Sequence, residues 1–247
     1  MRNQLWMIFG LSVLSAAHAL LAADVVEAGP KQSFEETSTE HLKFAPGGTI
    51  RVNHSYGHLT LEGWDEPEVW MTVIRTTNGF FEPSQKREAS QRFEQIRVSA
   101  ERVSDKELAI TTVLPPRRGF WPRPLSHADH LGVTLEYRIL APRNTRLIVD
   151  NDYGYVWVSD LTGDLDVHSH TGDMIILLPD PGRYAIDART RMGSVSSDFA
   201  GKTISRFVVG QNFAYAGQSP SRRVHLRMGR GSITIKSGPP FAPFHKD

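Results

Sequence analysis

A glycine recurs every nine residues in the segment VDNDYGYVWVSDLTGDLDVHSHTGDMIIL, and this repeat limits the possible folds more than any other feature. Gly154, Gly163 and Gly172 are each followed by apolar residues two and four positions later. Alternation with a period of two is typical of β-strands with one buried face. Glycine is favoured where the backbone needs a positive φ or passes close to another chain segment. We therefore expect short strands of about five residues, each opened by a glycine and separated by turns.

The same pattern occurs elsewhere in the chain at Gly57 and Gly231, and Gly193 has the apolar residue at the second position only. A single unit of this kind cannot bury its own apolar face, so its stability depends on stacking against further units. Between the repeats, the sequence predicts one short helix over residues 83–96 and hairpins over 96–114 and 133–148. The expected fold is all-β: a solenoid-like stack of short strands that share one dry interior.

The two ends of the chain differ from this pattern. Residues 1–19 contain one basic residue, the apolar run LWMIFGLSVL and then AHA, which predicts a secretory signal peptide. We expect a loose leader at 20–40, one repeat domain at 41–236 and a tail at 237–247. We expect no transmembrane segment after signal cleavage, and an exported protein in the periplasm or outside the cell, associated with the envelope. The segment 114–131 has four prolines and predicts a long loop.

Charge and cysteine content exclude several classes of function. Removing residues 1–19 removes Arg2 alone, so 28 − 1 = 27 basic residues face 27 acidic ones. This balance argues against nucleic acid as a partner, since phosphate binding needs a basic excess. The chain contains no cysteine, which excludes disulfides, thiol chemistry and cysteine metal ligands.

The predicted signal, the unit YGHLTLEGWDEPEV, the middle hairpins and the later glycine array together resemble the bacterial putative-adhesin domains of unknown function. These are described as toast-rack-like, and the resemblance covers residues 42–236. It implies an exported, non-enzymatic module of the cell envelope, without cofactors or established catalytic residues. Two features depart from the family pattern: the proline-rich insertion and the weak repeat between Gly193 and Gly231.

Histidines and acidic residues suggest two kinds of metal site. In the proline-rich segment, His127, Asp129 and His130 offer three ligands within four positions. His168 and His170 share one strand face, but we expect that face to be solvated. Aspartates crowd the turns of the array at the glycine interval, as in calcium-binding β-rolls, although TGDLDV matches that motif only in part. The other interpretation is that these aspartates accept hydrogen bonds from their own turns.

Three aromatic residues, Tyr153, Tyr155 and Trp157, alternate along one predicted strand, on the face opposite Val156 and Val158. An uncovered row of rings would form a binding platform on which sugar rings can stack. The alternative is that the helix or the proline-rich loop covers them.

These features favour a non-enzymatic, adhesin-like binding or scaffolding module that presents a surface to an envelope protein or a glycan. The alternatives are a structural β-repeat module stabilised by calcium or zinc, and a β-helix carbohydrate-active enzyme. The sequence has no Gly-x-Ser-x-Gly, phosphate loop or dinucleotide fingerprint. The sequence therefore gives no residue that we would assign to catalysis.

Overall fold

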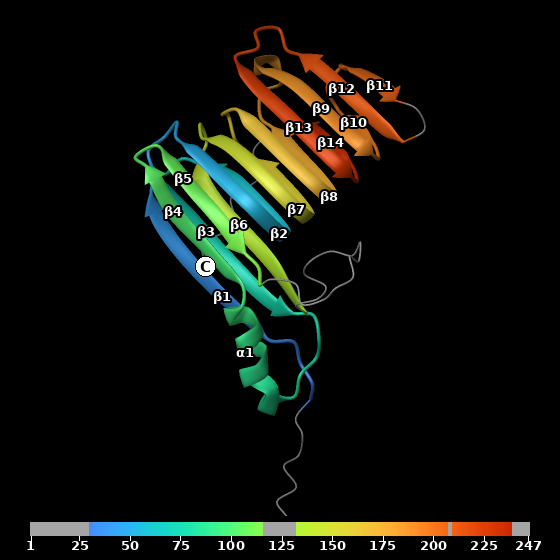
Figure 1. The fold of residues 1–247 in the computed structure, drawn as a ribbon. Helices are drawn as coiled ribbons and strands as arrows, with labels where there is room; N and C mark the ends of the chain where they lie inside the picture. Colours follow the sequence, from blue (N-terminus) through green and yellow to red (C-terminus); the bar gives the residue numbers. More distant parts are fainter. Residues whose placement is uncertain (1–29, 116–131, 207–208, 239–247) are drawn as a thin grey trace, which may run out of the picture.

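The computed structural model describes residues 30–115, 132–206 and 209–238, and strands dominate them (Figure 1). The predicted signal peptide, most of the proline-rich segment and the candidate ligands His127, Asp129 and His130 lie outside the described residues. The elements are β1 (Glu35–Lys43), β2 (Thr49–Trp64), β3 (Glu68–Thr77), η1 (Pro83–Gln85), α1 (Lys86–Glu94), β4 (Arg97–Ser104), β5 (Glu107–Val113), β6 (Val133–Pro142), β7 (Arg146–Ser159), β8 (Leu165–Leu178), η2 (Pro181–Arg183), β9 (Tyr184–Met192), β10 (Val195–Ser197), β11 (Lys202–Arg206), β12 (Gly210–Ala216), β13 (Arg222–Arg230) and β14 (Ile233–Ser237).

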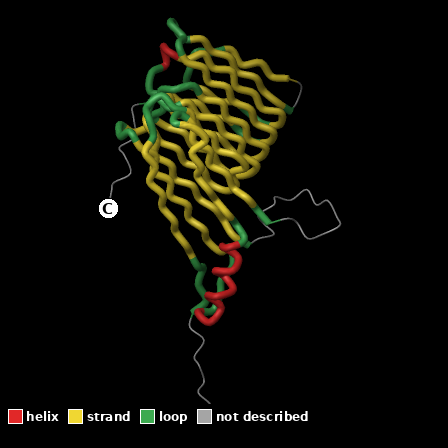
Figure 2. Tube along the Cα trace, turned by 60° about the vertical axis from the view of Figure 1, so that its left-hand side comes forward, coloured by secondary structure: helices red, strands yellow, loops and turns green. Residues whose placement is uncertain are grey.

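The longest strands each run through two layers of the molecule. The first half of β2 pairs with β5, whereas its second half pairs with β6. In the same way, the first half of β8 pairs with β13 and its second half with β14. The strands thus lie side by side along the molecule, as Figure 2 shows, and a glycine bend carries each long strand from one layer to the other.

The structural repeat, which we call a coil, is eighteen residues long, twice the interval between glycines in the sequence. Leu147 pairs with Leu165, which is 165 − 147 = 18 residues later, and Gly154 pairs with Gly172 at the same interval. The prediction of five-residue strands opened by glycines is wrong for β7 and β8, which have 14 residues each. Gly154 and Gly172 lie inside these strands, and Gly163 lies between them. Nine residues therefore take the chain from the edge that contains Gly154 to the opposite edge. Eighteen residues return it to the equivalent position on the neighbouring strand.

The predicted shared interior is confirmed. Val156, Leu165 and Met174 are at most 1% exposed, and they belong to one cluster of buried side chains to which both layers contribute. Period-two alternation on both sides of each glycine produces this cluster, because it turns one face of each half-strand inward. Burial of apolar area is the main stabilising contribution in a chain without disulfides.

The ends of the stack consist of antiparallel strands. The order is β1-β3-β6-β2-β7-β8-β13-β9-β12-β11, and the pairs β1–β3, β3–β6, β9–β12 and β12–β11 are antiparallel. The hairpin predicted over 96–114 is confirmed as β4–β5. The hairpin predicted over 133–148 is wrong, because β6 and β7 lie on either side of β2 and both run parallel to it. The intervening turn instead bonds to β2, with the Arg143 N–H donating to the Trp64 carbonyl.

The predicted helix is confirmed as η1 followed by α1, which buries Ala89 and Phe93. It lies at the end of the molecule, next to β1 and β3 (Figure 1). The domain begins earlier than the predicted boundary at residue 41, since β1 starts at Glu35 and pairs with β3. Because β1 is exposed along most of its length, its sequence is polar and does not show the alternation that would indicate a strand. No helix of the described ranges has the length and apolar character that a membrane span requires.

Candidate functional site

Five glycines form a row along the edge where the strands pass between layers. All have φ between +103° and +134°, a conformation that side chains other than glycine rarely adopt. A Cβ atom on any of the last four would lie 1.6–2.0 Å from the carbonyl oxygen of the preceding glycine in the row. The backbones of neighbouring strands therefore pack directly against one another at this edge, and Gly57 and Gly154 are buried. The members of the row, in spatial order, are Gly57, Gly154, Gly172, Gly231 and Gly193.

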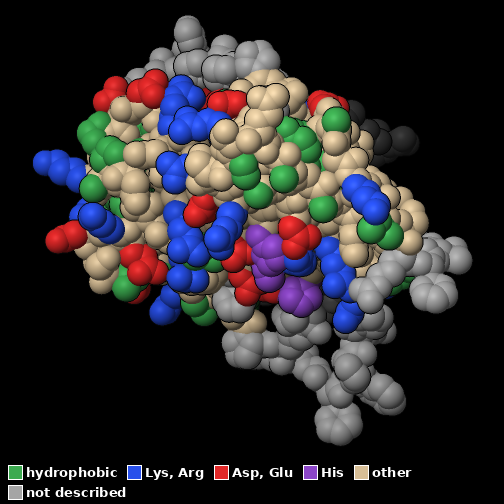
Figure 3. Space-filling view, turned by 90° about the horizontal axis from the view of Figure 1, so that it is seen from above, with side chains coloured by type: hydrophobic (Ala, Val, Ile, Leu, Met, Phe, Trp, Pro, Cys, Tyr) green, Lys and Arg blue, Asp and Glu red, His purple; other side chains and the backbone are tan. Residues whose placement is uncertain are grey.

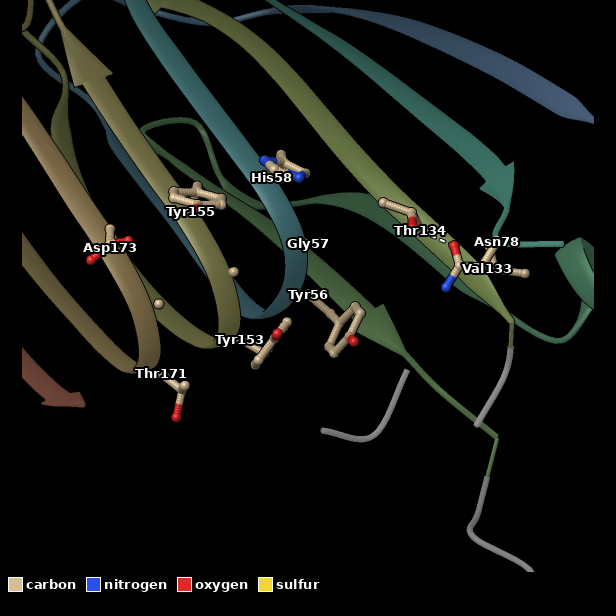
Figure 4. Close-up of a pocket in the computed structure, with 12 residues that line it drawn as sticks. Tyr56, Gly57, His58, Asn78, Val133, Thr134, Tyr153, Tyr155, Thr171 and Asp173 are labelled. Atoms are coloured by element: carbon tan, nitrogen blue, oxygen red, sulfur yellow. Dashed lines mark hydrogen bonds between the residues drawn. The ribbon is translucent and has the colours of Figure 1, made fainter. Parts of the chain in front are cut away.

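Side chains on either side of the first three glycines form two parallel rows (Figure 4). One row contains Tyr56, Tyr153 and Thr171, which precede the glycines; the other contains His58, Tyr155 and Asp173, which follow them. The rings of Tyr56 and Tyr153 stack with centroids 5.5 Å apart and an interplanar angle of 18°. The rings of His58 and Tyr155 stack at 5.1 Å and 11°.

These rows line a groove of about 280 Å³, with the glycines Gly57, Gly154 and Gly172 between them. Asn78, Val133 and Thr134 line its other end, and the Thr134 hydroxyl donates to the Asn78 side-chain oxygen. On the opposite side, the Asp173 carboxylate accepts a hydrogen bond of 2.9 Å from the Ser232 N–H, which fixes its direction. The groove thus combines aromatic rings with oriented polar groups, the usual composition of a small-ligand site.

The structure brings two of the three predicted aromatic residues into this groove. Tyr153 is 40% exposed and Tyr155 is 52% exposed, so α1 does not cover them. Trp157 lies two residues further along β7, is half-buried, and does not line the groove. The alternation pattern did not identify the other lining side chains Tyr56, His58, Thr171 and Asp173. Aligning Tyr-Gly-His, Tyr-Gly-Tyr and Thr-Gly-Asp on their glycines would have found them.

Two aspartates of the array accept hydrogen bonds from the backbone of distant segments of the chain. The Asp164 carboxylate accepts from the Arg223 N–H, and the Asp173 carboxylate from the Ser232 N–H. Each partner lies 59 residues away in the sequence, so the interpretation that these two side chains bond their own turns is wrong. The outward direction predicted for His168 and His170 is confirmed, since both are exposed.

A second group of charges lies at the opposite edge of the strands. Glu62 and Asp160 are buried, at 5% and 4% exposure, and Arg143 lies 3.9 Å from the Asp160 carboxylate. Burial raises the pKa of Glu62, the nearby charge of Asp160 raises it further, and Arg143 opposes both. Arg143 also donates to Asp65, a hydrogen bond of 2.7 Å that lowers the pKa of that exposed carboxyl.

Because its folded-state pKa is raised, ionised Glu62 destabilises the fold at neutral pH. Below the unfolded pKa of about 4.3, both states are protonated and the penalty disappears; it grows as pH rises through the folded pKa. We expect Glu62→Gln to raise the free energy of unfolding at pH 7 by up to about 1 kcal/mol and to change it little at pH 4. Urea unfolding at the two pH values measures this difference. The exposed Glu66→Gln is the control, and a loss of stability in Glu62→Gln at pH 7 would show that the attraction to Arg143 is the larger effect.

Comparison with known proteins places the fold. No known protein family and no curated protein matches the sequence. A solved structure described as a "putative cell adhesion protein" from Clostridium sporogenes aligns over 84% of this chain and 100% of its own, with 17% identity and a TM-score of 0.50. The fold is that of this adhesin-like protein. At this identity the likeness shows the fold alone, and it confirms at that level the predicted resemblance to putative-adhesin domains.

Two other solved structures align with lower scores. One is described as a "putative adhesin" from Bacteroides fragilis, with 14% identity, 82% of this chain and 97% of its own covered, and a TM-score of 0.30. The other is described as a "putative lipid binding protein" from Parabacteroides distasonis, with 8% identity, 82% and 96% covered, and a TM-score of 0.21.

Proposed function

We propose that this protein is an exported, non-enzymatic binding module of the cell envelope, and that the groove along its glycine edge binds a glycan. The observation that carries this proposal is the pair of ring stacks that line the groove and leave Tyr153 and Tyr155 exposed. Exposed aromatic surface of this kind in a monomeric domain marks an interaction site more often than chance would give. The adhesin-like neighbour agrees with a role in binding.

The geometry of the two stacks favours a ligand with a flat apolar face. Each stack runs along the strand-to-strand direction and ends at a small polar side chain, Thr171 in one row and Asp173 in the other. The Tyr153 and Tyr155 ring faces turned away from Tyr56 and His58 therefore point toward Thr171 and Asp173, on either side of Gly172. A pyranose ring has an apolar C–H face that can continue such a stack, as another aromatic ring would.

Polar groups at both ends of the groove supply hydrogen bonds to the edge of a sugar. Hydroxyl groups both donate and accept, and Asp173, Thr171 and Asn78 together offer both kinds of partner. Asp173 is the one carboxylate among the described residues that line the groove. Glycoside hydrolysis usually takes two carboxyl groups across the scissile bond, so this composition favours binding without cleavage.

Truncating the exposed rings tests the proposal. We expect Tyr155→Ala to weaken binding of a glycan identified on an array by about fivefold or more, because one stacking interaction contributes roughly 1 kcal/mol beyond area burial. Tyr153→Ala should act in the same direction. Isothermal titration against the purified full chain measures both effects, and we expect a smaller effect of Trp157→Ala because this ring lies outside the groove.

The matched control is Phe80→Ala, which removes an aromatic side chain that is 74% exposed and does not line the groove. We expect it to bind as the unmodified protein does. Glycan binding that survives both Tyr153→Ala and Tyr155→Ala would contradict the proposal, provided that both variants melt at the unmodified temperature.

A further inference from the structure

Two histidines and an aspartate converge on the outer face of the half-strands that precede the glycines. Asp166 and His168 lie on β8, and His225 lies opposite Asp166 on β13. Figure 3 shows histidine side chains gathered beside acidic ones, with basic side chains nearby. None of the three residues lines the groove of the proposed function, so this inference does not depend on that proposal.

Three potential ligand atoms meet at one point. The Asp166 Oδ1 atom lies 3.2 Å from His168 Nε2 and 3.0 Å from His225 Nδ1. One ligand atom from each of the three side chains falls within 4.8 Å of the other two. Ligand atoms of a tetrahedral zinc ion lie roughly 3.3–3.6 Å apart, given bonds of about 2.0–2.2 Å. Small side-chain rotations would therefore suffice to admit an ion between these atoms.

We propose that Asp166, His168 and His225 bind a divalent transition-metal ion such as Zn²⁺. Two imidazoles and one carboxylate are a donor set that suits Zn²⁺ and similar ions, and that hard cations such as Ca²⁺ do not favour. Three protein ligands leave a coordination position for water or for a ligand group. The ion would connect β8 to β13, strands whose paired residues are 59 positions apart in the sequence.

A further carboxylate lies near one of the ligands. Asp187 lies opposite His225 on β9, with its Oδ2 atom 3.8 Å from His225 Nε2, the ring nitrogen that faces away from Asp166. Metal-binding histidines usually face such a carboxylate through their second nitrogen, which fixes the ring orientation. Arg227 holds Asp187 by donating both to its carboxylate and to its backbone carbonyl. Arg227 is therefore paired with Asp187, and Asp187 would act as a positioning residue once an ion holds the His225 ring.

The ligands of this site come from two strands that are distant in the sequence, so no local motif indicates it. His168 and His170 form the obvious pair in HSHTG, yet His170 is not part of the cluster. The second imidazole comes from β13, which the fold places beside β8 although 225 − 168 = 57 residues separate the two histidines. A search for ligands within a few positions of each other cannot find this combination.

Titration with Zn²⁺ alone tests the proposal. We expect the purified full chain, stripped with a chelator, to bind one equivalent of Zn²⁺ and to melt at a higher temperature when the ion is present, because a ligand that binds the native state stabilises it. His168→Ala and His225→Ala should each weaken binding by more than tenfold. Asp187→Asn should weaken it by roughly tenfold while leaving the melting temperature of the metal-free protein unchanged.

The matched control is His170→Ala, which removes an exposed histidine from the same strand and the same face as His168. We expect it to retain full affinity. The proposal is overturned if no Zn²⁺ binds, in which case Asp166 serves only as the acceptor for two histidines. It is also overturned if binding survives in both His168→Ala and His225→Ala. Because all three ligand side chains are at least partly exposed, we expect every variant to fold, and circular dichroism checks this.

Discussion

Replacing Gly172 with alanine is expected to prevent folding. A Cβ atom at this position would lie 1.8 Å from the carbonyl oxygen of Gly154, and the residue has a φ of +132°. The obstructing atom is backbone, held by parallel pairing on both sides of β8, so a side-chain movement cannot relieve the contact. The two strands would have to separate at the bend. We expect a cost above about 4 kcal/mol, a large part of the 5–15 kcal/mol that stabilises a typical domain.

Two other glycines separate the effect of the contact from the effect of the backbone angle. Gly47 has a φ of +80°, but the nearest atom to its Cβ position is 3.9 Å away, so Gly47→Ala should cost roughly 1–2 kcal/mol. Gly79 meets only an ordinary contact at 3.5 Å, and Gly79→Ala should cost less than about 0.5 kcal/mol. Soluble yield and thermal melting measured by circular dichroism rank the three variants. A Gly172→Ala protein that melts at the same temperature as Gly47→Ala would contradict the assigned role of the glycine row.

The sequence predicted the local half of this architecture correctly and the long-range half incompletely. Alternation around Gly154 identified Val156 and Val158 as core residues, because inward and outward directions depend only on neighbours along one strand. It could not identify which strands pair. For example, β2 lies beside β7 although their paired glycines are 154 − 57 = 97 residues apart. The segment between them, β3 to β6, does not follow the glycine interval, so the interval cannot predict this pair.

The same distinction applies to the candidate sites. The alternation of Tyr153 and Tyr155 with buried residues of the same strand predicts that they lie on its outer face, but it does not decide whether another element covers them. Their stacking partners, Tyr56 and His58, come from β2, and no pattern within β7 indicates them. The Asp166–His168–His225 cluster needs the pairing of β8 with β13, which no local pattern indicates. Side chains that gather from different coils are therefore the part of the site that the structure adds.

Deleting one full coil is expected to leave a folded protein, whereas deleting half a coil is expected to abolish folding. Removing the eighteen residues 155–172 joins Gly154 to Asp173, so the first half of β7 continues into the second half of β8. Each half keeps its layer, and the remaining glycine stays in the row. Stability in such stacks is roughly a sum over repeats and their interfaces. We expect a loss of a few kcal/mol and a melting temperature lower by about 10 °C.

Removing the nine residues 155–163 is the matched comparison, because it joins Gly154 to Asp164 and preserves the local rhythm. Leu165 and Val167 then follow the glycine at the second and fourth positions, as the sequence pattern requires. However, the segment 164–171 moves to the opposite layer, and Gly172 moves to the opposite edge, where its positive φ serves no bend. If nine residues were the structural repeat, both deletions would be tolerated equally. Circular dichroism and soluble yield decide the matter, since a folded nine-residue deletion would contradict the eighteen-residue coil.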